Sequence, residues 1–137
     1  MKVIGFNGRS YPWRLSRNIR LDDDNRQTSC LHQRVKTLLK QLFPLEHICE
    51  EVYLPGSNGL KADFVIITRK LIVEAQGAQH YHFVGKFYNT KLDFIEACIR
   101  DKRKREWAEL NNLILVELRY DRSEREWEKA ITSALGT

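Results

Sequence analysis

Residues 62–75 read ADFVIITRKLIVEA, with two apolar runs, FVII and LIV, on either side of a basic pair. Both runs are rich in β-branched residues, which is typical of buried strands. Only Arg69 and Lys70 separate the strand expected at residues 62–68 from that at residues 71–75, which predicts a tight antiparallel hairpin. Asp63 opens the first strand and Glu74 ends the second. Counting outward from the turn, we expect both carboxylates near the same end of the sheet.

The sequence on either side of this hairpin predicts the remaining elements. Apolar residues recur at helical spacing from Ser29 onward, and Pro44 ends that helix. In chain order we expect this helix, a strand at Glu50–Leu54, the two hairpin strands, a helix at Lys91–Leu110, a strand at Leu113–Leu118, and a last helix that begins at the Ser123–Glu126 capping box. The fold class is therefore α/β, a mixed central sheet flanked by helices on both faces.

Length and composition favour one cytoplasmic domain. A chain of 137 residues fits a single domain. No apolar run reaches the roughly 18 residues that cross a membrane, and the N-terminus lacks the apolar core of a signal peptide. The three cysteines are widely spaced without a CxxC pair, which argues against disulfides and a structural zinc site. A reducing cytoplasm fits these features best.

Residues 1–28 are predicted to form a basic N-terminal arm ahead of a domain at residues 29–137. The apolar residues of the arm show no helical period, so we expect an extended segment or short strand that either packs on the domain or grips a partner. The net charge of +5 permits an anionic partner. Segments that track a nucleic-acid backbone mix cations with aromatic rings, as here in Arg9, Tyr11, Trp13, Arg14, Arg17 and Arg20.

Asp63 and Glu74 are candidate metal ligands, together with Ala75 beside Glu74. Two converging carboxylates can hold Mg²⁺ or Mn²⁺, which completes its coordination with waters and phosphate oxygens. Such an ion activates water and stabilises charge on a phosphodiester. The alternative is a pair of exposed acids without function. Glu74 follows a run that should be buried, however, and a carboxylate there needs a partner.

The residues after Glu74 suggest acid–base chemistry. Strand alternation places Gln76 on the same face as Glu74. His80 and His82 follow in a loop, where a histidine either is a surface residue or moves protons near neutral pH. On the long helix, Asp101 continues an apolar stripe. An acid there either orients His80 or forms a salt bridge within its helix.

This set of residues resembles the PD-(D/E)xK endonuclease superfamily, whose αβββαβ core carries one acid on the second strand and "(D/E)xK" on the third. Asp63 matches the first acid, and Glu74-Ala75-Gln76 matches the second half-motif. The string Glu74…Gly77…His80, followed by Asp101 and Lys104, is similar to very-short-patch-repair-like nucleases and related phage homing endonucleases. The resemblance covers residues 29–120.

The resemblance implies a restriction-endonuclease-like core with an extra C-terminal helix. It also implies an Mg²⁺- or Mn²⁺-dependent enzyme that hydrolyses DNA, of the phage homing or repair type, in a bacterial or phage-infected cell. Asp63, Glu74, Gln76, His80 and Asp101 would then carry catalysis.

Two positions depart from the superfamily pattern. Gln76 stands where the superfamily has lysine, so the usual charge on the attacking water is missing there. Either Lys104 or Lys102 on the following helix substitutes, or His80 does the proton work. Ala62 replaces the proline of "PD", a position that varies in the superfamily. Where family members often carry an acid on the first helix, this chain offers His32, which either orients water or metal or is a half-exposed helix residue.

Two further segments are candidates for contact with DNA. The basic run 100–105 is either a solvated face or a phosphate-binding surface, with Lys102 and Lys104 as contacts. Tyr81 and Phe83 belong to an aromatic loop that either covers the core or wedges between bases. Other functions remain open, namely a nuclease-fold module that binds nucleic acid without cutting it and a structural protein. A partner protein or a homodimer is also open.

Overall fold

The computed structural model describes residues 1–15, 29–77 and 91–136. The elements are β1 (Lys2–Ile4), β2 (Ser10–Pro12), α1 (Cys30–Leu42), β3 (Cys49–Tyr53), β4 (Lys61–Ile66), β5 (Leu71–Gln76), α2 (Lys91–Leu110), β6 (Ile114–Arg119) and α3 (Glu124–Ala134). From α1 onward, the described elements follow the predicted order of helix, three strands, helix, strand and helix. None of the helices in these described ranges is both long enough and apolar enough to cross a membrane.

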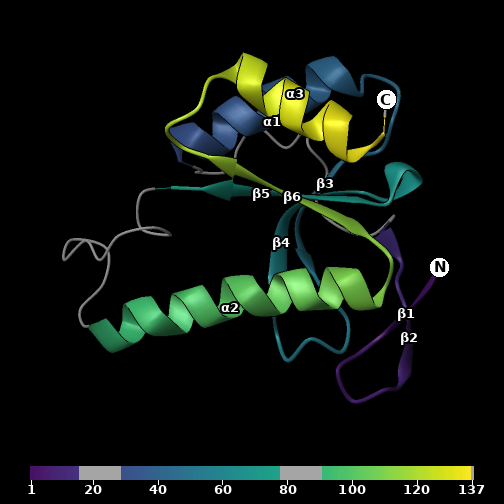
Figure 1. The fold of residues 1–137 in the computed structure, drawn as a ribbon. Coiled ribbons are helices and arrows are strands. Elements are labelled where there is room, and N and C mark those ends of the chain that lie inside the picture. The colour runs from purple at the N-terminus through teal and green to yellow at the C-terminus, as the bar shows by residue number, and fades with distance from the viewer. Residues whose placement is uncertain (16–28, 78–90, 137) are drawn as a thin grey trace.

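The central sheet has the strand order β3-β4-β5-β6. Its first three strands are antiparallel neighbours, whereas β6 pairs with β5 in parallel after the chain has passed through α2. Helices α1 and α3 cover one face of this sheet and α2 runs along the other (Figure 1). The prediction of a mixed sheet with helices on both faces is therefore confirmed.

Each face of the sheet has its own hydrophobic core. In β4, Phe64 and Ile66 pack with α1 and α3, whereas Val65 packs on the side of α2. Both faces are buried, so the strand reads as a continuous apolar run rather than as an alternating one.

The β4–β5 turn is longer than the predicted two-residue turn. Strand β4 ends at Ile66, and one turn of 3₁₀ helix (Ile67–Arg69) follows. Lys70, with φ 52°, then donates its N–H to Ile67 O at 3.0 Å. A two-residue hairpin turn of type I′ needs positive φ at both central residues, which Arg-Lys does not favour. The longer turn needs this conformation only at Lys70.

The first 15 residues form an antiparallel hairpin, β1–β2, that packs on the domain. Val3, Trp13 and Leu15 are buried in the core on the α2 side. The backbone approaches closely at Gly5, where an added Cβ would lie 2.7 Å from Gly56 Cα. Of the two alternatives for the predicted arm, residues 1–15 therefore follow the first, in which the arm packs on the domain.

Trp107 is the central side chain of the α2-side core. It is fully buried, and its ring meets that of Trp13 edge to face with 5.2 Å between centroids. Its indole Nε1 donates a hydrogen bond to Pro55 O at 2.9 Å. These contacts fix the rotation of α2 about its own axis, and thereby the side chains that α2 presents to the sheet.

We expect Trp107→Ala to lower the free energy of unfolding by about 3–5 kcal/mol, because it leaves a large cavity and an unpaired carbonyl. Urea unfolding followed by circular dichroism measures this loss. The matched control is Glu106→Ala, an exposed neighbour on α2, which should change stability by less than about 0.5 kcal/mol. A loss below about 1 kcal/mol for Trp107→Ala would contradict this description of the core.

Candidate functional site

The carboxylates of Asp63 and Glu74 each accept a backbone hydrogen bond where the β4–β5 pairing ends. The register pairs Phe64 with Val73, and one further step places Asp63 opposite Glu74. The Asp63 backbone N–H donates to Glu74 Oε2 at 3.0 Å, and the Ala75 N–H donates to Asp63 Oδ2 at 2.9 Å. Each carboxylate therefore accepts a hydrogen bond from a backbone N–H of the opposing strand. The structure brings these two predicted acids together.

Lys104 reaches this carboxylate pair from α2. Its Nζ lies 2.9 Å from Glu74 Oε1, and the Glu74 residue is only 5% exposed. Asp101, nearly one turn earlier on α2, is half-buried and also acts electrostatically on Lys104. Lys104 therefore contacts Glu74 and is also influenced electrostatically by Asp63 and Asp101.

The charges at this site perturb one another. Burial raises the pKa of the Glu74 carboxyl well above its ordinary value, and Asp63 adds to this rise, whereas Lys104 acts in the opposite direction. Burial alone lowers the pKa of Lys104, but the neighbouring Glu74, with Asp63 and Asp101, outweighs it and the net pKa is raised. Burial and Asp63 together outweigh Lys104, so the ionised form of Glu74 is disfavoured at this site.

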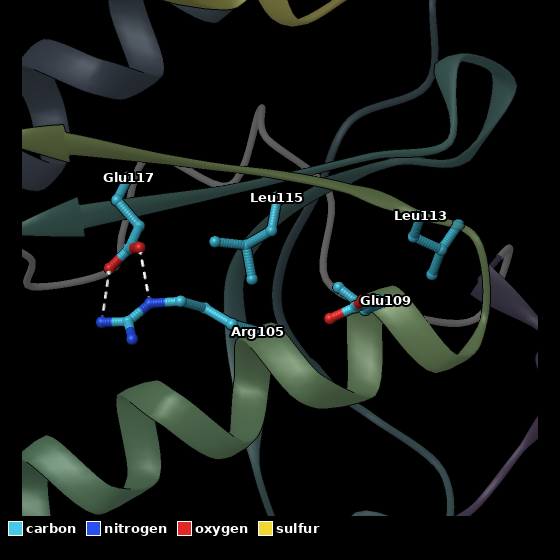
Figure 2. Close-up of a pocket in the computed structure, with 6 residues that line it drawn as sticks. Arg105, Glu109, Leu113, Leu115 and Glu117 are labelled. Carbon is cyan, nitrogen blue, oxygen red and sulfur yellow. Dashed lines mark hydrogen bonds and ion pairs between the residues drawn. The ribbon is translucent and has the colours of Figure 1, made fainter.

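Gln76 is held by a second ion pair on the same face. Its amide Nε2 donates to Glu117 Oε2, and Arg105 Nε donates to Glu117 Oε1 at 2.7 Å. Figure 2 shows Arg105 on α2 and Glu117 on β6 pointing toward one another beside a cavity of about 280 Å³. The cavity lining does not include Asp63 or Glu74, so the cavity is separate from the carboxylate pair.

A further polar cluster lies on the opposite face, beneath α1. His32 Nε2 is 2.8 Å from Glu50 Oε1, and Lys36 Nζ is 3.6 Å from Glu50 Oε2. The His32 ring stacks on Phe64, with 4.5 Å between centroids. His32 is only 8% exposed, so the interpretation of it as a half-exposed residue is wrong. His32 can be buried because its ring is paired with the carboxylate of Glu50, which faces α1 from β3.

Sequence reasoning missed Glu50 and Lys36. A signal was present in α1, where His32 and Lys36 lie one turn apart within the apolar face. Two polar side chains on a buried helix face need a partner, and the buried carboxylate of Glu50 on the neighbouring strand supplies it.

The remaining predicted residues lie as follows. Arg9 and Arg14 are exposed near the N-terminal hairpin, and Lys102 is exposed on α2. Lys104 points to Glu74 instead of extending the exposed basic run. Several predicted residues lie outside the described residues, and their roles stay predictions: His80, Tyr81, Phe83, Arg17 and Arg20.

The donor set fits a hard divalent cation. Asp63 and Glu74 offer carboxylate oxygens, and the backbone N–H of Ala75 donates to one of them, Asp63 Oδ2. In the described part of the chain, no group of three or more His, Cys, Asp or Glu side chains is arranged to hold a metal. Mg²⁺ is commonly held by one or two carboxylates plus waters and substrate phosphates, so a two-carboxylate site suits it.

Comparison with known proteins finds one viral relative of limited overlap. No family model matches the chain, and no solved structure matches it. A protein of Invertebrate iridescent virus 6, "Uncharacterized protein 307L", is 40% identical over 68 residues, which are 47% of this chain and 34% of the viral protein. The chain thus spans about a third of the length of this curated relative. The name of that protein states no activity.

The raised pKa of Glu74 predicts a pH dependence of stability in metal-free buffer. The folded state favours the protonated form of Glu74 over the ionised form. Its contribution to stability is therefore full below the unfolded-state pKa and is lost as pH rises through the folded-state pKa. Lys104 stays charged across this window, since its pKa is raised. Glu74→Gln cannot ionise, so we expect its free energy of unfolding to decline less steeply over this window than that of the wild type.

Urea unfolding at a series of pH values measures these slopes. Glu128→Gln, at an exposed position on α3, is the matched control and should keep the wild-type profile. Parallel profiles for the wild type and Glu74→Gln would show that Glu74 is not perturbed by its surroundings.

Proposed function

We propose that this protein is a metal-dependent DNA endonuclease of the phage homing or repair type, with a restriction-endonuclease-like core. The observation that supports this most is the pairing of half-buried Asp63 with buried Glu74 where the pairing of β4 with β5 ends. The order of elements from α1 to β6 agrees with the αβββαβ pattern that the sequence resembles.

In this proposal Asp63, Glu74 and Ala75 hold Mg²⁺ or Mn²⁺. The bound ion would lower the pKa of a water and stabilise charge on the phosphate. Gln76, whose amide is fixed by Glu117, orients that water. The water oxygen bonds to phosphorus, the bond from phosphorus to the leaving sugar oxygen breaks, and that oxygen takes a proton from solvent.

The proton lost by the water passes to His80. Asp101 orients the His80 ring in this mechanism. Both roles come from the sequence pattern, and Asp101 is half-buried on the α2 face that carries Lys104.

DNA binding is proposed for exposed basic residues of the N-terminal hairpin region and of α2. Exposed Arg9, Arg14 and Lys102 would contact phosphates, which position the protein without reading bases. Sequence assigns the same role to Arg17 and Arg20, and a stacking role to Tyr81 and Phe83. A partner protein or a second copy would supply further sequence specificity.

One observation favours a second candidate function, a nuclease-fold module that binds nucleic acid without cutting it. Gln76 occupies the lysine position of the motif, and its amide is engaged with Glu117. The two functions differ in one readout, since a binding module retains DNA in a salt-dependent manner and leaves it intact with every divalent ion.

We expect the wild-type protein to cleave supercoiled plasmid with Mg²⁺ or Mn²⁺ and not with EDTA. Asp63→Ala and Glu74→Ala should each lower the cleavage rate by about a hundredfold or more, because each removes a metal ligand. Agarose gels of nicked and linear product measure the rates. Glu128→Ala, which removes an exposed carboxylate from α3, is the control and should cleave at the wild-type rate.

Wild-type activity retained in either site variant would exclude the site. DNA retention without cleavage by the wild-type protein would instead support the binding module. A wild-type protein that neither retains DNA nor cleaves it would contradict both functions.

A further inference from the structure

The contact between Lys104 and Glu74 blocks one face of the carboxylate pair. Glu74 Oε2 and Asp63 Oδ2 each accept a backbone N–H from the opposing strand. Glu74 Oε1, the other oxygen of the buried carboxylate, is 2.9 Å from Lys104 Nζ. The oxygen of Glu74 that is not used by the backbone is therefore in contact with an ammonium group.

Lys104 is held in this position by its surroundings. Its side chain is 17% exposed, and that of Glu74 is 7% exposed, so water screens the pair weakly. Trp107 lies close to Lys104 on α2, and its packing against Trp13 fixes the rotation of this helix that directs Lys104 inward. The neighbouring Arg105 is engaged with Glu117 on β6. Lys104 is thus built into the site.

A divalent cation and this ammonium group compete for the same oxygen. Both carry positive charge, and at contact distance in a poorly solvated site their mutual repulsion is strong. Conversely, the two carboxylates without any cation would be left as a buried, uncompensated pair.

We propose that Lys104 is an internal counter-ion that compensates part of the charge of the Asp63–Glu74 pair in the metal-free protein and that an incoming divalent ion must displace from Glu74. This inference rests on the proposed metal site. It has two consequences. Lys104 stabilises the metal-free fold, and it weakens metal binding by the cost of breaking its ion pair.

The test compares Lys104→Met with Lys129→Met, which makes the same change at an exposed position on α3. Isothermal titration with Mn²⁺ should give a dissociation constant roughly three- to tenfold lower for Lys104→Met than for the wild type, and unchanged for Lys129→Met. Without metal, Lys104→Met should melt at a lower temperature than either. Mn²⁺ should raise its melting temperature by more than it raises that of the wild type.

Cleavage supplies a further readout that does not depend on the maximal rate. The Mg²⁺ concentration for half-maximal plasmid cleavage should fall by the same factor in Lys104→Met. If Lys104→Met does not fold without metal, Lys104→Gln, which still donates a hydrogen bond without the charge, takes its place in all three measurements.

The outcomes separate this inference from the function proposed above. Equal or weaker Mn²⁺ binding by Lys104→Met, with a wild type that binds and cleaves, would overturn the counter-ion role and leave the nuclease intact. Mn²⁺ binding that appears only in the variant would support it. No Mn²⁺ binding by wild type or variant would overturn the metal site and this inference with it.

Discussion

The register of the β4–β5 hairpin is the constraint on which the site depends. Pairing of Phe64 with Val73 sets Asp63 opposite Glu74, and a slip of one residue would turn every side chain of one strand to the other face of the sheet. Such a slip would exchange the residues that face the two cores, which are both apolar and both covered by helices. Because both faces are apolar, hydrophobicity alone would not prevent the slip; the turn from Ile67 to Lys70 fixes the register, and the register brings the two carboxylates together.

Gathering charges in a buried place opposes folding, because taking a carboxylate out of water is unfavourable unless it is paired. The structure compensates with the backbone N–H groups of Asp63 and Ala75, which donate to Glu74 and Asp63 respectively, and with the ammonium group of Lys104. The compensation is incomplete, as the raised pKa of Glu74 shows. Residues that conflict with the rules of a well-packed core are concentrated at functional sites, where the conflict serves binding or chemistry. The carboxylate pair with Lys104 is such a conflict in this chain, and it is where we propose the metal site.

Local sequence was sufficient to predict the helices, the strands of the central sheet and the proximity of Asp63 to Glu74, since apolar periodicity, helix caps and a reversal of the chain near Arg69-Lys70 indicate these features, whereas the exact turn was not predicted. The direction of Lys104 could not be predicted, because it depends on the rotation of α2 and hence on the contact of Trp107 with Trp13, far away in the sequence. The burial of His32 likewise depends on Glu50, which reaches it only once β3 packs beneath α1. Contacts between distant segments have no local signature.

The central claim is that Asp63 and Glu74 together bind one divalent ion. Anomalous diffraction from a crystal soaked in Mn²⁺ tests it most directly, because the signal locates the ion independently of any activity. We expect one strong peak within about 2.5 Å of a carboxylate oxygen of both residues, with Lys104 withdrawn from Glu74. A crystal without a peak at this pair, in which Lys104 still contacts Glu74 at saturating Mn²⁺, would contradict the claim.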